Sequence, residues 1–305
     1  MRGGITNKSL STKKTSISFI PGISLNKVDS HSFIQYILIE DDQKLKEKTT
    51  HTAYVRFDLD DFSVQKNPFR VQIGHSIFTE DFIQIDFSDK SYHFKGNIQL
   101  GEFLEIERSL YSPNIMGPFA YIPKMQCYHG VISMQHDLKG SLKINNQRID
   151  FTEGLGYIEK DWGNSFPKKY IWLHSNHFSE PSTSLFFSIA HIPFYITEFE
   201  GFIVNLVYRE KEYRFASYNQ SKCEIKEINE NAVLIQLENK RASLKIKAEI
   251  KNQGQLIAPI KDGHMLKTIK EGISGKICIN LLDKENGQYY EDVGENAGVE
   301  IVDYS

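Results

Sequence analysis

Short segments in which apolar and polar residues alternate make up most of this chain, and clusters of Asp, Asn, Gly, Ser and Pro separate them. A period of two, in segments rich in Ile, Phe, Val and Tyr, predicts β-strands. In the first half the predicted strands are Phe33–Glu40, His51–Phe57, Phe69–Ile73, Phe82–Phe87, Tyr92–Leu100, Leu104–Arg108, Gln126–Met134, Ser141–Ile144 and Arg148–Phe151. No apolar period of helix length occurs among them.

The second half repeats this pattern after residue 178. Its predicted strands are Ser184–Ile192, Phe202–Tyr208, Tyr213–Ser217, Cys223–Ile228, Val233–Glu238, Ala242–Glu249, Ile273–Leu282 and Gly298–Val302, and only His264–Lys270 is predicted as a short helix. Many short strands at even spacing predict an all-β protein, and in a chain of this size two consecutive antiparallel β-barrels. We expect the boundary near Asp150, giving barrels at 1–150 and 151–305, each with an interior wide enough for side chains or one apolar ligand.

Composition narrows the class of partner. The 305 residues are 40% hydrophobic and carry a formal net charge of -3, which predicts a globular protein with a large core and gives no reason to expect nucleic-acid binding. The three cysteines show no paired spacing, which argues against a disulfide framework or a cysteine zinc site. No apolar run has the length of a signal peptide or a membrane span. We therefore expect a cytoplasmic protein that binds an apolar small molecule and touches a membrane transiently at most.

The stretch Gly154–Phe178, GLGYIEKDWGNSFPKKYIWLHSNHF, holds both tryptophans of the protein. Strand alternation places Tyr157, Glu159 and Asp161 on one face of a strand. Beyond the Gly163–Pro167 break, the same alternation groups further polar and aromatic side chains on one face of the next strand: Trp172, His174, Asn176 and Phe178. Two such faces can line one cavity that offers a proton donor and aromatic rings. The alternative is a hairpin with an aromatic core face and solvated charges.

Three other segments carry weaker signals. Tyr111–Lys124 contains three of the nine prolines together with Ile, Met, Phe and Tyr, which predicts a loop that covers something apolar, such as a lid. His129 and His136–Asp137 form a second polar cluster, either at the pocket or in a hairpin. Asp58–Asp61 is predicted as a solvated loop rather than a calcium site. His174 and His177 lie on opposite strand faces and cannot share one metal ion, so no metal site is predicted.

Several long strings resemble the tocopherol cyclase family. They are GYIEKDWGNSFPKKYIWLHSNHF, the upstream SPNIMGPFAYIPKMQCYHGVISMQHDLKGSL, and the downstream LIAPIKDGHMLKTIKEGISGKICINL and NAGVEIV, so the likeness extends from about Phe19 onward. The resemblance implies two lipocalin-like barrels, related to carotenoid hydratase-like proteins. Characterised plant and cyanobacterial members close the chromanol ring of tocopherols from a prenylated hydroquinone without a redox cofactor. The resemblance thus predicts cofactor-independent cyclisation of such a substrate, the alternative being a lipocalin-like lipid carrier without catalysis.

The start of the chain departs from the family pattern. Family members begin with a strand resembling Gly-Trp-Tyr-Phe before the equivalent of Ser18–Gly22, where this chain has MRGGITNKSLSTKKT. The first strand is therefore predicted to be missing or altered. A missing strand would leave an open edge, and a shortened, inactive relative is a third interpretation.

The resemblance also implies roles for particular residues. Protonation of a prenyl double bond needs an acid in a dry pocket, for which Glu159 and Asp161 are the candidates, although both could be surface charges. The carbocation needs an aromatic face, from Trp162, Trp172 or Tyr157, and Trp162 could instead be a packing residue. The residues that could hold the quinol oxygen and accept its proton are Asn176, His174 and His129. The predicted substrate contacts are Tyr128, Tyr157, Phe166, Trp172 and Phe178.

Overall fold

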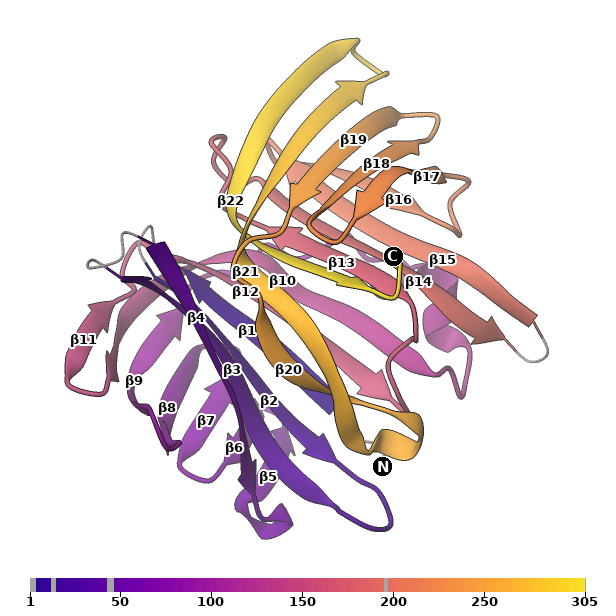
Figure 1. Cartoon of the computed structure of the whole chain (residues 1–305). Coiled ribbons are helices and arrows are strands. Elements are labelled where there is room, and N and C mark those ends of the chain that lie inside the picture. Colours follow the sequence, from indigo (N-terminus) through magenta and orange to yellow (C-terminus); the bar gives the residue numbers. More distant parts are fainter. Residues whose placement is uncertain (1–3, 12–14, 43–46, 195–196, 305) are drawn as a thin grey trace.

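The computed structural model describes residues 4–11, 15–42, 47–194 and 197–304, and these residues fold into antiparallel β-sheets. The described part contains no α-helix, and its helical elements are the 3₁₀ turns η1 (Leu59–Asp61), η2 (Gly117–Tyr121) and η3 (Lys261–Gly263). None of its helices is long and apolar enough to cross a membrane. The prediction of an all-β protein is confirmed, and Figure 1 shows the strands arranged as two twisted sheets.

The first sheet has twelve strands. They are β1 (Gly4–Ser11), β2 (Ser16–Ser24), β3 (His31–Asp42), β4 (Glu47–Phe57), β5 (Phe62–Lys66), β6 (Phe69–Ile73), β7 (Ser76–Thr79), β8 (Phe82–Ser88), β9 (His93–Leu100), β10 (Cys127–Ile144), β11 (Gln147–Asp150) and β12 (Leu155–Gly163). The order across the sheet is β4-β3-β2-β1-β12-β10-β9-β8-β7-β6-β5, with β11 paired to β10.

The second sheet has ten strands. They are β13 (Tyr170–Ser175), β14 (Ser184–Phe194), β15 (Thr197–Tyr208), β16 (Lys211–Ala216), β17 (Lys222–Asn229), β18 (Ala232–Glu238), β19 (Ala242–Glu249), β20 (Gly254–Pro259), β21 (Met265–Asp283) and β22 (Gln288–Val302). The order is β16-β15-β14-β13-β22-β21-β19-β18-β17, with β20 paired to β21. Within the described residues, both hydrogen-bonded paths have two ends, so the pairings define open sheets rather than closed barrels.

The start of the chain contributes a strand to the first sheet. β1 pairs antiparallel with both β2 and β12, with Leu10 opposite Ile17 on one side and Gly156 on the other. Backbone pairing thus fills the place where the sequence predicted a missing or altered strand. Because β12 also belongs to this sheet, the change from the first sheet to the second falls between Gly163 and Tyr170, later than the boundary expected near Asp150.

Two predicted elements are wrong. Leu104–Arg108 is not a strand, because Leu104 makes only two backbone hydrogen bonds to β10, with Gln135 and Met134, and no ladder follows. His264–Lys270 is not a helix, because Met265 onward forms the long strand β21. The prediction omitted the partner strand β20, whose ladder with β21 pairs Leu256 with Ile269.

Three apolar clusters form the core. One is formed by side chains of the first sheet and contains Phe19, Tyr36 and Phe94, and another is formed by side chains of the second sheet and contains Leu173, Phe187 and Leu244. The third lies between the sheets and joins side chains of both: Ile20, Ile37, Val131, Tyr157, Trp172, Phe186, Leu256 and Ile269. Burial at this seam holds the two sheets together, at roughly 25 cal/mol for each Å² of apolar surface removed from water.

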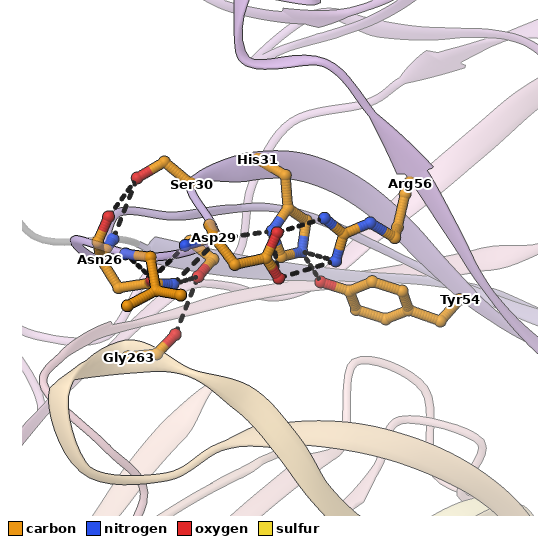
Figure 2. A network of polar contacts seen from close by, with 9 residues as sticks. Asn26, Asp29, Ser30, His31, Tyr54, Arg56 and Gly263 are labelled. Carbon is orange, nitrogen blue, oxygen red and sulfur yellow. Dashed lines mark hydrogen bonds and ion pairs between the residues drawn. The ribbon is translucent and has the colours of Figure 1, made fainter.

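Polar contacts also tie the sheets to each other. The side-chain amide of Gln35 on β3 donates to the carbonyl of Ile257 on β20 (2.9 Å) and accepts from the backbone N–H of the same residue (2.7 Å). The Ser24 hydroxyl donates to the carbonyl of Gly263 (2.8 Å), beside the polar network of the β2–β3 loop shown in Figure 2. Here β20 and the adjoining part of β21 extend along the first sheet (Figure 1).

Candidate active site

A cavity of about 160 Å³ lies at the seam between the two sheets. Strands of the first sheet contribute Ile20, Gln35 and the polar side chains of β10 and β12, and strands of the second sheet close the other side. Most of the wall is apolar, with the following side chains among its members: Met116, Phe119, Met125, Phe166, Ala190, Ile192, Phe202, Leu256 and Ile269. Such a space suits an apolar ligand held by a few placed polar groups.

Glu159 is a buried carboxyl group in this wall, with 5% of its surface exposed. Its Oε2 accepts hydrogen bonds from the Tyr157 hydroxyl (2.7 Å) and the Trp172 indole N–H (3.0 Å). Burial raises the pKa of Glu159 to about 7, while the charge of His129 opposes the rise. A proton is therefore gained or lost by this group near neutral pH, which suits a general acid.

His129 and Asp161 form an ion pair beside Glu159. The Nδ1–H of His129 donates to Asp161 Oδ1 at 2.6 Å, and His129 Nε2 lies 3.4 Å from Glu159 Oε2. Burial acts to lower the pKa of His129, but the charges of Asp161 and Glu159 outweigh it and raise that pKa to about 9. The imidazole is thus a cation at neutral pH, and it stacks on Phe186 with ring centres 4.8 Å apart.

Trp172 presents its indole to the cavity from β13. Its ring lies close to Gly298 on the neighbouring strand β22, where an added Cβ would come within 2.5 Å of the ring carbons. Glycine at this position therefore leaves the space for the indole. The same ring donates to Glu159, so the proton donor and an aromatic face are adjacent in the cavity.

The structure brings five of the residues predicted from the sequence into the cavity wall, namely His129, Glu159, Asp161, Phe166 and Trp172. Glu159 and Asp161 of β12 and Trp172 of β13 therefore line the same cavity. The surface-charge alternative does not hold for Glu159, which is buried.

Three more predicted residues are buried next to the cavity wall and do not line the cavity. Tyr157 lies behind Glu159 and reaches it through its hydroxyl. His174 stacks on Tyr157, with ring centres 3.6 Å apart, and burial lowers the pKa of His174 to about 3, so it is neutral. The Asn176 amide donates to the carbonyl of Gly156 (2.9 Å), which joins β12 to the second sheet. These three residues therefore hold the residues of the cavity wall in position and do not face the cavity themselves.

The remaining three predicted residues pack elsewhere. Tyr128 and Trp162 stack in parallel on each other, with ring centres 5.3 Å apart, and Trp162 lines a separate cavity of about 50 Å³. Phe178 packs against the core of the second sheet. The packing alternative for Trp162 agrees with this placement.

Among the polar residues of the cavity that sequence reasoning missed are Tyr170, Glu271 and Glu300. Tyr170 shares the strand face of Trp172 and could have been found by the same alternation. Glu300 stands in the apolar run GVEIV, where an isolated carboxylate is itself a signal. Glu271 gives none, because it directly follows His264–Lys270, the segment predicted as a helix. From the loop predicted as a lid, Met116 and Phe119 reach the cavity.

The described residues contain no group of three or more His, Cys, Asp or Glu side chains arranged to hold a metal ion. Asp60 and Asp61 of the acidic segment lie in the exposed turn η1. Cys127, Cys223 and Cys278 are free cysteines. Burial raises the pKa of the Cys127 thiol well above its usual value, with the negative charge of Asp161 adding to the effect.

Solved structures share this fold. Kievitone hydratase from Nectria haematococca superposes with a TM-score of 0.56 at 11% identity, over 98% of this chain and 89% of the other. A putative AttH from Nitrosomonas europaea gives a TM-score of 0.54 at 12% identity, over 98% of this chain and 92% of the other. CghA with Sch210972 gives 0.55 at 7% identity, over 99% and 88%. No curated protein matches the sequence.

A protein-family model agrees with the resemblance of the sequence strings. The model described as tocopherol cyclase-like matches residues 116–302, which include β10, β12 and all strands of the second sheet. All the polar residues of the cavity discussed above, except Gln35, lie inside the matched region. The chain therefore belongs to the tocopherol cyclase-like family.

Proposed function

We propose that this protein catalyses acid-promoted addition of a hydroxyl group to a carbon–carbon double bond, closing a ring in a prenylated hydroquinone or a similarly apolar substrate. One observation carries the proposal. A largely apolar cavity contains a buried carboxyl group, Glu159, whose pKa of about 7 leaves it protonated for much of the time at neutral pH. Glu159 is the proposed acid, and a redox cofactor has no part in this reaction.

The surroundings of Glu159 suit a proton donor. After it gives its proton to the double bond, the carboxylate keeps hydrogen bonds from Tyr157 and Trp172 and the nearby charge of His129. These groups are already oriented, so they stabilise the developing negative charge without rearranging. Asp161 holds His129 in place and maintains its charge, and we assign both as positioning residues.

The carbocation formed by protonation needs stabilisation until oxygen attacks it. The Trp172 ring lines the cavity beside the acid, and a desolvated cation–π contact contributes roughly 2 kcal/mol. Attack by a hydroxyl group of the same molecule closes a ring, and attack by water hydrates the double bond. The neighbouring structure named a hydratase and the cyclase family thus fit one chemistry with two nucleophiles.

The cavity volume limits what is held inside. A volume of about 160 Å³ matches a small ring, since roughly 150 Å³ accommodates benzene. We propose that the aromatic head and the reacting double bond occupy this space, and that a longer tail leaves past Met116 and Phe119. This loop would then act as the lid that its sequence predicts.

Incubation of the purified protein with a panel of prenyl hydroquinones under anaerobic conditions tests the proposal. Mass spectrometry and retention time would reveal a product of unchanged mass that lacks the double bond. We expect such an isomer from the wild-type protein and a loss of its formation in Glu159→Gln. Tight retention of a lipid by the wild-type protein without conversion would instead support a carrier of the lipocalin type.

A further inference from the structure

One carboxyl group of the cavity wall takes no part in the mechanism above. Glu271 lies on β21, with 5% of its surface exposed, and it lines the cavity. Ile269, two residues earlier on the same face of this strand, lines the cavity as well. Glu271 therefore faces the ligand space from the second sheet, whereas Glu159 faces it from the first.

The Glu271 carboxyl group has an oxygen without a partner. Its Oε1 is buried and makes no hydrogen bond within the part of the chain that the structure describes. Glu300, on the neighbouring strand, instead accepts a hydrogen bond from the Tyr170 hydroxyl. An unpaired buried polar group costs about 1–3 kcal/mol, and nearly all such groups in folded proteins have a partner. An unpaired carboxyl group in the wall of a ligand-sized cavity indicates that a ligand supplies the partner.

The protonation state of Glu271 decides what kind of partner this is. Burial raises its pKa well above the usual value, and the negative charges of Glu300, Glu159 and Asp161 add to the rise. Burial also raises the pKa of Glu300 to about 8, opposed by the Tyr170 hydrogen bond, so this neighbour is mainly protonated too. Glu271 is thus a neutral carboxylic acid at neutral pH, and its O–H is a hydrogen-bond donor.

We propose that Glu271 binds an uncharged oxygen atom of the ligand by donating its carboxylic acid O–H to a carbonyl, ether or hydroxyl oxygen. The ligand class that fits is an apolar molecule that carries such an oxygen. A pure hydrocarbon would leave the donor unpaired. The contact does not depend on conversion of the ligand, because a carrier protein would use it in the same way.

The proposed reaction leaves one oxygen free for this contact. A hydroquinone has two oxygen atoms, and ring closure uses one of them. Glu271 then holds the other oxygen from the second sheet, while Glu159 protonates the double bond from the first. This choice of oxygen rests on the proposed function, whereas the donor role of Glu271 does not.

A pair of unreactive ligands tests the contact. An acetophenone with a saturated isopentyl side chain offers a carbonyl oxygen, and the matched hydrocarbon has an isopropyl group in place of the acetyl group. The ratio of their Kd values, measured on the full-length protein, gives the preference for the ketone. Glu271→Met, which has similar length and no donor, should lower this preference about tenfold, as the loss of one hydrogen bond predicts. Glu271→Gln should keep it within about threefold, because the amide N–H donates instead.

The control for these measurements is Glu291→Met. Glu291 is exposed and lies on β22, so its replacement should leave the preference unchanged. An unchanged preference in Glu271→Met would overturn the proposal. A marked rise of the preference in Glu271→Gln would overturn it too, because an ionised carboxylate in the wild-type protein would repel the carbonyl oxygen and the amide would not.

The thermal stability of the ligand-free protein separates a ligand contact from a structural role. Glu271→Met replaces an unpaired buried polar group by an apolar one, so the melting temperature should stay the same or rise. A large fall in Glu271→Met, with Glu291→Met unchanged, would show that the carboxyl group bonds within the protein and would overturn the proposal.

Turnover of prenyl hydroquinones distinguishes this inference from the proposed function. If the wild-type protein converts none of them but the ketone preference depends on Glu271, the proposed function fails and the donor role stands. If it converts one and Glu271→Met leaves the ketone preference unchanged, the donor role alone fails.

Discussion

The apolar cluster of the first sheet and the seam between the sheets both contain aromatic side chains, but the cavity of about 160 Å³ lies at the seam. In the first sheet, Phe94 contacts Tyr36, Phe19 and Phe87 with ring centres 4.7, 5.8 and 5.1 Å apart. At the seam, aromatic side chains stand beside carboxyl groups that cannot pack as closely. The aromatic cluster of the first sheet thus stabilises the fold, whereas the proposed active site lies in the cavity between the two sheets.

This difference also revises where a ligand is expected. The sequence suggested a ligand inside one of two barrels, as in small lipocalin-like proteins. The cavity instead takes walls from both sheets, so the polar groups of the site come from strands distant in the chain. The distinction predicts that substitutions in one region change turnover and those in the other change stability.

The largest effect is expected from Glu159→Gln at the seam. The amide keeps the shape of the side chain and cannot donate the proton, so turnover should fall by roughly two to four orders of magnitude while affinity changes little. Turnover and the Kd of an unreactive analogue, measured on the same preparation, check this. Asp86→Asn, a partly exposed carboxyl of the first sheet, is the matched control. A fully active Glu159→Gln would refute the assignment of the acid.

The counterpart in the filled interior is Phe94→Ala. This side chain is completely buried, and its removal should lower the free energy of unfolding by about 3–5 kcal/mol. Chemical denaturation measures the loss, and the folded fraction should retain its turnover. A loss of turnover with unchanged stability would show that the two regions are not separate in function.

A smaller effect separates the two tryptophans. Trp172→Phe removes the N–H that donates to Glu159 and keeps an aromatic face, so turnover should fall about tenfold, the value of one hydrogen bond to a charged group. Trp162→Phe, outside the main cavity, should leave turnover unchanged. Steady-state kinetics on both variants measures the two turnover rates. An equal loss of turnover in both would contradict the placement of Trp172, and not Trp162, beside the acid.

The smallest effect concerns pH. Glu159 must be protonated to act as an acid, and its pKa of about 7 means that turnover should fall as the pH rises through neutrality. His129→Gln removes a positive charge that lowers this pKa, so the falling limb should move to higher pH by roughly one unit or more. The pH–rate profile measures the shift, with His191→Gln, a more exposed histidine, as control. A shift to lower pH would disprove the electrostatic role of His129.

Local patterns predicted much of the strand structure. Alternation identified the two faces that carry Glu159 and Trp172, because both strands have one buried polar face and the signal lies within a few residues. Leu104–Arg108 has the composition of a strand without the partner ladder, and His264–Lys270 lies in a strand that depends on β20. The composition of a segment shows whether it could form a strand. Whether it does so also depends on a partner strand elsewhere in the chain.

Only part of the candidate site could be predicted from the sequence. Glu159, His129 and Trp172 lie within or near one distinctive stretch, whereas Glu271 and Glu300 come from two paired strands near the end of the chain. Their proximity follows from the register of β21 and β22 and from the contact between the sheets. No spacing rule within the sequence expresses that arrangement.

The position of β12 has a consequence for protein synthesis. This strand lies between β1 and β10, so the middle of the first sheet is completed only by residues that follow everything else in that sheet. While the chain is being made, β1 and β10 leave the ribosome with backbone groups that have no partner, and such edges invite association with other chains. These unpaired edges are therefore expected to persist until β12, which ends at Gly163, has been made.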